Sequence, residues 1–457
     1  MINNNFKKII VFDDDPTGSQ TVFDCPLLLT LDEETILRSL KLSSPLLFLL
    51  ANTRSLSPYI VEARTKEICQ SLLRALKKTS IKTEDVLFIS RGDSTLRGHG
   101  ILEPYILNEE LGPFDATFHV PAFFEGGRTT VDDVHLLDGI PVHKSIFARD
   151  KVFGYSTSYL PKWLQEKSKG SIVQNNVSSI SISDLEQAIS SESGMKNLLT
   201  FLSKLSCNEM VVVNANLPKH LDVFAFAIKT LKGKKRFLFR SAASLLNAIS
   251  KIDSSSNSIK NFSDLRVKNR FNKPRPGLVL VGSHVQLADD QLERLLTENA
   301  CIGVELPLDK IRRILEEECS ETLISELKKS YAIKIKDILY QGKTPVLYTT
   351  RRELKFDSSA KRLTFGLVIA QVMAALSSEV IDDIGYIISK GGITTHILLS
   401  EGLKLDLVHL KGQIIPGISV VSSYNKNQLN LPIITFPGNL GNQNTLLDSW
   451  KIMESKN

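Results

Sequence analysis

The amino-acid sequence predicts an α/β protein with two domains, each a mostly parallel sheet flanked by helices, and an active site in the cleft between them. The chain has 457 residues, which is more than one ordinary hydrophobic core organises. In both halves, short apolar runs typical of buried strands alternate with amphipathic stretches typical of helices. A polar, Ser-rich stretch separates the halves, so we expect a first domain over residues 1–255, a linker over 256–275 and a second domain over 276–457.

The first half begins with an apolar run at residues 9–12, which predicts a buried strand. A second run, at 45–50, is followed by Ser57 and Pro58, a typical N-cap and first helical residue. The helix expected after them places apolar side chains on one face: Ile68, Cys69, Leu72, Leu73 and Leu76. Further strands are expected at residues 86–89, 116–120 and 210–213. Strands separated by helices imply βαβ units and therefore a parallel sheet.

The stretch between the halves, residues 253–276, is rich in serine at its start and carries Pro274 and Pro276 at its end. A new strand is expected at residues 278–281, where the alternation of strands and helices restarts. The alternative interpretation of this stretch is a long surface loop within one domain.

The composition favours a soluble cytoplasmic protein that binds small anions. The net charge of +6 is mild, and no Lys/Arg block is dense enough to indicate nucleic acid; the basic cluster at 232–236 is expected to be a solvated turn. The five cysteines form no Cys-x-x-Cys pair, which argues against a zinc cluster or a disulfide framework. We expect no signal peptide and no membrane span, and a homo-oligomer is left open.

An acidic turn follows the first expected strand. Asp13, Asp14 and Asp15 come directly before Pro16, Thr17 and Gly18. In open α/β sheets, ligands bind beyond the carboxyl ends of the strands. Three adjacent carboxylates repel one another, so this position favours a cation or a hydroxyl group to deprotonate. The alternative is an acidic strand-to-loop turn without function.

Two further loops of the first half also follow strands and carry groups that bind anions. The loop after residue 89 contains Arg91, Asp93, Ser94, Thr95 and Arg97. Arginine binds carboxylate and phosphate with two parallel hydrogen bonds, and small hydroxyl residues donate to the same anion. The loop at 121–130 adds Arg128. An Arg–Asp pair that braces the turn is the alternative for the first of these loops.

Gly-rich turns follow strands in the second half, at Gly282-Ser283, at residues 389–395 and at 436–441. A strand-to-helix turn exposes backbone N–H groups at the positive end of the helix, so together these turns predict a pocket for nucleotide phosphates. No Gly-x-Gly-x-x-Gly occurs, so the standard fingerprint of dinucleotide-binding domains is missing. Lys343 lies in a Gly-Lys-Thr sequence like the end of a Walker A loop, but Asp337 stands where its first glycine should be.

These loops together resemble the motifs of the four-carbon acid sugar kinase family. The family's Ala-Asp-Asp-x-Thr-Gly is similar to residues 13–18, with Asp13 in place of alanine. Its Lys-x-Asp-Ser-Thr-Leu-Arg-Gly is similar to residues 91–98, with Arg91 in place of lysine. Its Pro-Ala-Phe-Pro-x-x-Gly-Arg-Thr-Thr is similar to residues 121–130.

The resemblance continues into the second half. The family's Gly-Ser and Gly-Gly-x-Thr are similar to residues 282–283 and 391–394. Its Lys-Pro-Gly-Asn-Phe-Gly is similar to residues 436–441, with Phe436 in place of lysine. Asn214 stands where an aspartate is expected after its strand.

The resemblance implies an ATP-dependent kinase that phosphorylates the terminal hydroxyl of a four-carbon sugar acid. Asp14 or Asp15 would deprotonate that hydroxyl. The acid would contact residues of the first domain: Thr17, Arg91, Asp93, Ser94, Thr95, Arg97 and Arg128. ATP would contact residues of the second domain: Ser283, Gly391, Gly392, Ile393, Thr394 and Gly438. Mg²⁺ would bridge the phosphates.

Two other classes of function fit part of the pattern. Asp13-x-Asp15-x-Thr17 is similar to the nucleophile motif of haloacid-dehalogenase-type phosphatases, with Asp13 as nucleophile and Asp15 as acid. That interpretation needs a later lysine and an acidic pair, and Asp382-Asp383 precedes its expected strand instead of following it. A non-catalytic sugar-acid sensor would bind its ligand without consuming ATP.

Overall fold

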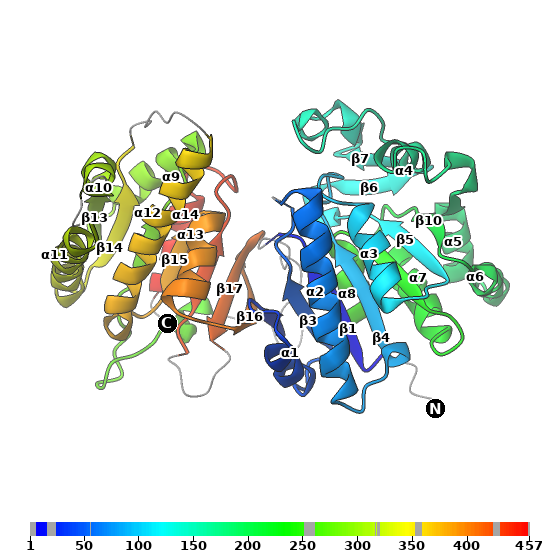
Figure 1. The fold of residues 1–457 in the computed structure, drawn as a ribbon, viewed down its shortest axis with the longest axis horizontal. Helices are drawn as coiled ribbons and strands as arrows, with labels where there is room; N and C mark the ends of the chain where they lie inside the picture. The colour runs from blue at the N-terminus through cyan, green and yellow to red at the C-terminus, as the bar shows by residue number, and fades with distance from the viewer. Residues whose placement is uncertain are drawn as a thin grey trace. The chain divides into compact units, whose positions relative to one another are not determined.

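The computed structural model describes residues 6–15, 24–54, 56–250, 261–315, 317, 320–351, 359–423 and 430–455. The chain divides into two compact units, Met1–Ser254 and Ser255–Asn457 (Figure 1). Each unit contains a mostly parallel sheet with helices on its faces, which confirms the predicted fold class. The serines at 254–258 lie outside the described residues.

The sheet of the first unit is parallel throughout. Its strands lie in the order β2 (Cys25–Leu28), β3 (Leu46–Leu50), β1 (Lys8–Asp13), β4 (Val86–Arg91), β11 (Phe237–Ser241), β5 (Ala116–Val120), β10 (Glu209–Val213) and β9 (Ser178–Ile180). From β1 the chain runs to β2 and β3 on one side and then to β4 on the other. The strand order therefore reverses between β1 and β4, and such a reversal opens a crevice at the carboxyl ends of the strands.

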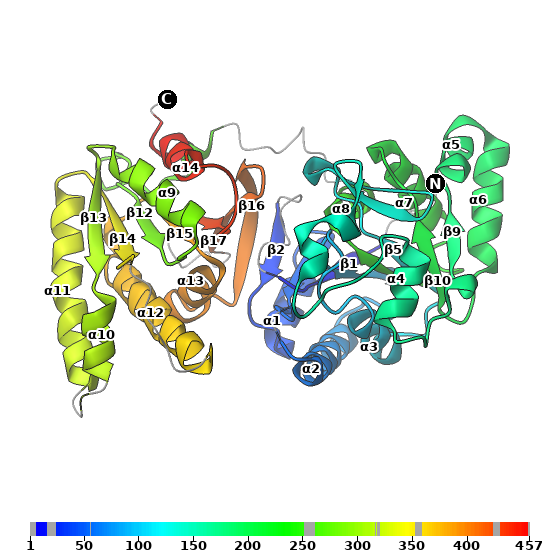
Figure 2. The same ribbon diagram turned by 90° about the horizontal axis from the view of Figure 1, so that it is seen from above.

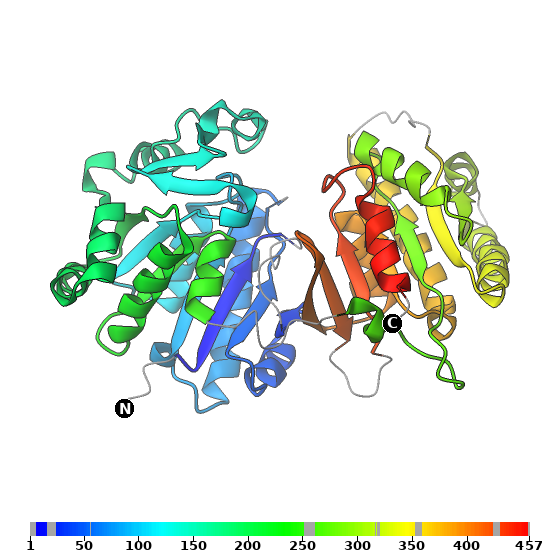
Figure 3. The ribbon, with the colours of Figure 1, turned by 180° about the vertical axis from the view of Figure 1, so that it is seen from behind.

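Helices cover both faces of this sheet. Figure 2 shows α2 (Pro58–Lys77) and α3 (Leu102–Leu111) on one side of the strands and α7 (Pro218–Thr230) and α8 (Ala243–Ser250) on the other, and Figure 3 shows the second face in green. The helices α1 (Glu33–Leu40), α5 (Ile182–Ser190) and α6 (Glu192–Lys204) lie nearer the sheet edges. Pro58 begins α2 as predicted, and Ile68, Cys69, Leu72 and Leu76 of the predicted apolar face are buried, whereas Leu73 is half-buried.

A small antiparallel sheet stands at the carboxyl end of the large one. It contains β6 (Arg128–Val131), β7 (Val134–Leu137) and β8 (Ile140–Pro141), and it packs beside α4 (Leu160–Lys167) (Figure 1). Asp132 and Asp133 have positive φ angles of 49° and 61°, so they form the tight two-residue turn that joins β6 to β7. Thr130 pairs with Ala215, just past the end of β10.

The sheet of the second unit is parallel with an antiparallel extension. Its strands lie in the order β13 (Cys301–Leu306), β14 (Thr344–Thr349), β12 (Leu278–Val281), β15 (Ile387–Lys390), β18 (Ile433–Phe436), β17 (Ile418–Ser423) and β16 (Leu407–Ile415), of which β17 and β16 are antiparallel. From β12 the chain runs to β13 and β14 on one side and then to β15 on the other. The reversal between β12 and β15 places a second crevice beside Gly282 and Gly391.

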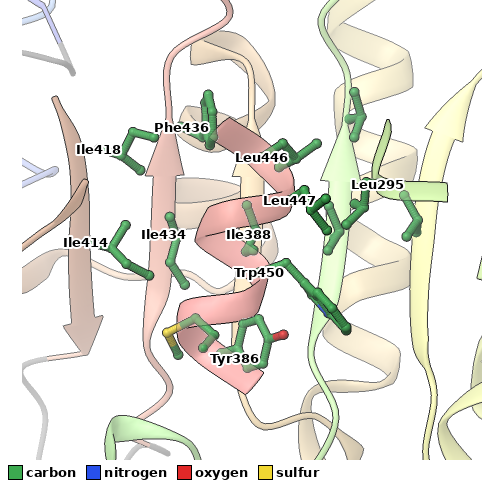
Figure 4. Close-up of a cluster of buried hydrophobic side chains, with 14 of the residues drawn as sticks. Leu295, Tyr386, Ile388, Ile414, Ile418, Ile434, Phe436, Leu446, Leu447 and Trp450 are labelled. Atoms are coloured by element: carbon green, nitrogen blue, oxygen red, sulfur yellow. The ribbon is translucent and has the colours of Figure 1, made fainter. Parts of the chain in front are cut away.

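The helices of the second unit also lie on two faces. In Figure 2, α9 (Gln286–Leu296) and α14 (Thr445–Glu454) lie on one side of the strands, and α12 (Ser359–Glu379) and α13 (Gly392–Ile397) on the other. A π-helical turn, Leu398–Gly402, continues α13, while α10 (Leu308–Leu315) and α11 (Ser320–Tyr340) flank β13 and β14. Leu446, Leu447 and Trp450 of α14 pack on the strands over Ile388 and Ile434 (Figure 4).

Short 3₁₀ helices complete the described structure: Thr83–Asp85, Phe124–Gly126, Val142–Lys144, Ile146–Arg149, Gln174–Asn176, Phe262–Leu265 and Ile381–Asp383. Across the described residues, no helix combines the length and the apolar character needed to cross a membrane.

Candidate functional site

The three consecutive aspartates stand at the crevice between β1 and β4. Asp13 pairs in register with Arg91 of β4 and with Leu50 of β3, so the ends of three strands meet here. Asp13 and Asp14 are buried, whereas Asp15 is partly exposed. Burial of adjacent carboxylates is unfavourable unless cations surround them, and the structure places three arginines around this group.

Arg54 is the central cation of the cluster. Its guanidinium donates to Asp14 Oδ1 at 2.6 Å and to Asp15 Oδ2 at 3.0 Å. The pKa of Arg54 is raised: burial disfavours its charge, but Asp14, Asp15 and Asp93 outweigh that effect. The sequence interpretation missed this residue, although its position four residues after β3 was a usable signal because β3 pairs with β1.

Arg240, near the end of β11, is a second cation that the sequence interpretation missed. One guanidinium nitrogen lies 3.5 Å from Asp14 Oδ2, and another donates to Ser90 Oγ at 2.7 Å and to the carboxylate of Glu103. Glu103 also accepts from the hydroxyl of Thr53. Arg240 therefore ties the acidic turn to α3 through a buried network.

Asp13 differs from its two neighbours. Burial raises the pKa of Asp13 to about 7, against the opposing charge of Arg91, whose Nη1 lies 3.4 Å from Asp13 Oδ1. Its Oδ2 has no hydrogen-bond partner among the described residues. A phosphatase nucleophile must be reachable and ionised, so a fully buried and partly protonated Asp13 disfavours the phosphatase interpretation.

The loop after β4 forms its own network. Arg97 donates to Asp93 Oδ2 at 2.6 Å, the Thr95 hydroxyl donates to the same carboxylate, and Arg97 stacks over the ring of Phe147. Burial opposes the charge of Asp93, but Arg54 and Arg97 outweigh it and lower the pKa of Asp93 to about 2. Arg97 and Asp93 thus form the Arg–Asp pair that was the alternative interpretation of this turn. Arg54 links the loop electrostatically to the acidic turn.

Gly98 allows this loop to approach the aspartates. Its φ angle is +91°, a conformation that favours glycine. A Cβ at this position would lie 2.9 Å from Asp14 Oδ2. The glycine of the second motif is therefore needed for the contact between the two loops.

Two of the remaining residues that are predicted to bind the acid, Arg128 and Ser94, have partners within the protein. Arg128 donates to the carbonyl of Gly126 and lies over the ring of Phe123, and its charge interacts with those of Asp93 and Arg97. Ser94 is buried, and its carbonyl accepts from His135 Nε2 at 2.7 Å. Thr17 lies outside the described residues.

A cavity of about 30 Å³ adjoins the same loop. Asp93, Arg97 and Arg240 line it together with His119 and Trp163. Among the described residues, His119 Nε2 and Trp163 Nε1 are buried without a hydrogen-bond partner. Burial lowers the pKa of His119 to about 3, and Arg240 adds to this effect, so the ring is neutral. The cavity has a mostly apolar lining with a few polar groups, and it has room for about one water molecule or one small polar group of a ligand.

In the second unit, the three Gly-rich turns meet at the ends of β12, β15 and β18. A Cβ on Gly438 would lie 2.9 Å from Ser283 Oγ, so the turns at 282–284 and 436–441 are in close contact. Gly391 precedes α13 with a φ angle of +121°. Within the described part of the chain, the N–H groups of residues 438–441, Ser283 and residues 392–394 donate to no protein acceptor. Such groups are suited to bind phosphate oxygens.

Two cations that the sequence interpretation missed lie beneath these turns. Arg351, just after β14, donates to the carbonyls of Ser283 at 2.5 Å and Val281 at 3.2 Å, and it pairs with Asp289. Lys390, the last residue of β15, is fully buried. Burial lowers the pKa of Lys390 to about 8, and the charge of Arg351 contributes.

Family models match both units of the chain. The model of a sugar-binding N-terminal domain matches residues 9–249, which is more than half of the sequence, and the model of a nucleotide-binding C-terminal domain matches residues 278–446. The chain belongs to the four-carbon acid sugar kinase family. The family thus assigns sugar binding to the unit with the arginine–aspartate cluster and nucleotide binding to the unit with the Gly-rich turns.

Solved structures share the fold of this family member at low sequence identity. A Salmonella typhimurium LT2 protein, provisionally named a tRNA synthase, has a TM-score of 0.67 and 16% identity, with 97% of this chain and 98% of that chain covered. Haemophilus influenzae protein HI1011 has a TM-score of 0.66 and 17% identity, with 97% and 100% covered. No curated protein matches the sequence.

Proposed function

We propose that this family member is an ATP-dependent kinase that phosphorylates the terminal hydroxyl of a four-carbon sugar acid of the threonate, erythronate or 3-oxo-tetronate type. The observation that carries the proposal is the cluster at the β1–β4 crevice, where carboxylates that can accept a proton stand beside arginines that can bind an acid. The Gly-rich turns of the nucleotide-binding unit supply unpaired N–H groups for phosphate oxygens.

The carboxylate of the substrate would bind at the loop after β4. Arg97 is the most accessible guanidinium of that loop, and Arg128 is close enough for its charge to be coupled to that of Arg97. Ser94 and Thr95 belong to the same turn, and their hydroxyls would complete the contacts. Arg91 is buried against Asp13 and Asp14, so we assign it to holding the acidic turn in place.

The proton of the terminal hydroxyl would go to the acidic turn. Asp14 is buried, and both of its oxygens face arginines, so it is suited to orient Arg54 and Arg240. Asp15 is partly exposed, so a substrate hydroxyl can reach it. We therefore propose Asp15 as the proton acceptor and Asp14 as the residue that positions the cluster.

The nucleotide would bind to the turns of the second unit. Backbone N–H groups of Gly392, Ile393 and Thr394 would contact phosphate oxygens, with Ser283, Gly391 and Gly438 shaping the same pocket. Mg²⁺, when bound, neutralises the phosphate charge and is held mainly by the phosphates and water.

The test is ADP release from ATP and Mg²⁺ in the presence of erythronate, threonate and 3-oxo-tetronate isomers, one acid at a time. We expect release with one acid and not with the others. Asp15→Asn and Asp14→Asn should each lower turnover by about 10²-fold or more while ATP still binds with unchanged affinity.

Asp222→Asn, at an exposed position on α7, is the matched control and should retain full activity. Unchanged turnover in both site variants would contradict the assignment of the acidic turn. Bound ATP without ADP release for any acid would favour a sensor or a different acid substrate.

A further inference from the structure

The buried lysine of the nucleotide-binding unit has an unusual position. Lys390 Nζ donates to the carbonyl oxygens of Pro437 at 3.2 Å and Gly438 at 3.1 Å, and it lies 4.1 Å from the centre of the Phe436 ring. The side chain is completely buried under the Gly-rich turn at 437–441. Both of its hydrogen-bond acceptors belong to that turn.

This ammonium group has no counter-ion among the residues that the structure describes. In the described ranges of the chain, no carboxylate lies within ion-pairing distance of Lys390 Nζ, and the only other charge that affects its ionisation is the positive charge of Arg351. Buried charges are normally paired, because an isolated charge in a low-dielectric interior is strongly unfavourable. Arg351 is itself paired with Asp289, so Lys390 leaves an unbalanced positive charge below the turn.

The strand register connects Lys390 with position 436. Lys390 on β15 pairs directly with Phe436 on β18, where the family motif begins with lysine and this chain has phenylalanine. The ammonium group stands over the phenylalanine ring. The positive charge of Lys390 thus lies beside position 436 and below the turn at 437–441.

We propose that Lys390 is a positioning residue that supplies the positive charge of the nucleotide site from beneath the turn at 437–441. It holds the carbonyls of Pro437 and Gly438 inward, and its charge attracts the phosphates that bind the free N–H groups on the outer side. This inference rests on the proposed function, in which a nucleotide phosphate is the missing anion.

The first test compares the binding of ADP and adenosine to the full-length protein by calorimetry. Lys390→Met should weaken ADP binding by roughly 10- to 100-fold, since a charge-assisted interaction is lost, and should leave adenosine binding unchanged. The apo form of the variant should melt at the same or a higher temperature than the wild type, because a buried unpaired charge is removed. Lys334→Met, at an exposed position on α11, is the control and should bind ADP normally.

A purely structural role predicts a different result. Equal weakening of ADP and adenosine together with a lower melting temperature would overturn the proposal, and so would unchanged ADP affinity. The double variant Lys390→Met/Phe436→Lys should recover ADP affinity to within about fivefold of the wild type. Absence of recovery would contradict an electrostatic role for Lys390, because a charge on the neighbouring strand would then not replace it.

The pH profile is an independent readout. ADP affinity of the wild type should fall as the pH rises through about 8, where Lys390 loses its proton, and Lys390→Met should not show this loss. Of the described titratable groups around the turn, Arg351 stays charged over this range, and burial lowers the pKa of His284, which therefore stays neutral. If the wild type binds neither ATP nor ADP, the proposed function is refuted. If the wild type binds ADP and Lys390→Met binds ADP equally well, only the inference about Lys390 is refuted.

Discussion

At the acidic turn, Asp13 is the aspartate that stands where the family has alanine. Its neighbours Asp14 and Asp15 are paired with Arg54, whereas one oxygen of Asp13 has no partner among the described residues. Burial disfavours the charge of Asp13, Asp14 and Asp15 add repulsion, and Arg91 offsets these effects only in part. Asp13 therefore makes the stability of the protein depend on pH.

The direction of this dependence follows from the pKa of Asp13. Burial raises the pKa of Asp13 from 3.8 to about 7, so between these values the folded state binds more protons than the unfolded state. The Asp13 contribution to stability is fully present below about pH 4 and is lost as the pH rises through 7. We expect Asp13→Asn to be more stable than the wild type at pH 8, on the order of 2 kcal/mol, and much closer to it at pH 5.

Urea denaturation of both proteins at the two pH values measures this difference. Asp222→Asn, which removes an exposed carboxylate, should show no such change between pH 5 and pH 8. A stability difference between Asp13→Asn and the wild type that is the same at both values would show that Asp13 is ionised throughout.

At the scale of elements, the small sheet β6–β8 is attached to the large sheet by Asn214. The side chain of Asn214 donates to Asp133 Oδ1 at 2.7 Å and to the carbonyl of Ile180, and it accepts from the Asp133 N–H at 2.7 Å. An aspartate at 214 would face the carboxylate of Asp133 at the same distance. The asparagine is therefore explained by its partner in the β6–β7 turn.

Replacing Asn214 by aspartate, alone and together with Asp133→Asn, tests this explanation. Asn214→Asp should lower the free energy of unfolding by about 2 kcal/mol, because two carboxylates would meet in a half-buried contact. The double variant Asn214→Asp/Asp133→Asn should recover at least half of that loss, which a double-mutant cycle measures. Additive losses would contradict the pairing, and Asn175→Asp, at an exposed site, should change stability by less than about 0.5 kcal/mol.

At the scale of the whole molecule, each of the two compact units has its own reversal of strand order, and each matches its own family model. A ligand stabilises the part of a protein to which it binds. The nucleotide should therefore protect one unit and the sugar acid the other.

Hydrogen exchange of the full chain can measure this division. ADP should slow the exchange of N–H groups at residues 283–284, 391–394 and 438–441, by about 10-fold or more at saturation, without changing the loop at 91–98. A sugar acid that supports turnover should slow the exchange of the loop at 91–98 without changing the exchange of the three turns in the second unit. Equal protection of both sets by ADP would contradict the assignment of the nucleotide to the second unit.

Much of the fold could be predicted from the sequence because its signals are local. The strands expected at residues 116–120 and 278–281 have those bounds in the structure, and Pro58 begins its helix as expected. Apolar runs, proline positions and glycine turns act within a few residues of one another, so they can be recognised without knowing what packs against them. The motif loops could be found for the same reason.

The cations of the site could not be found in this way. Arg54 and Arg240 belong to no motif loop, and Lys390 lies in a Gly-rich turn that gives no sign of its partners; each contacts residues at the end of another strand. The sequence by itself determined the two α/β units and the loops that end their strands, because these depend on short-range patterns. Only the tertiary structure decided which charges meet at the strand ends, because strand order and register bring together residues that are distant in the chain.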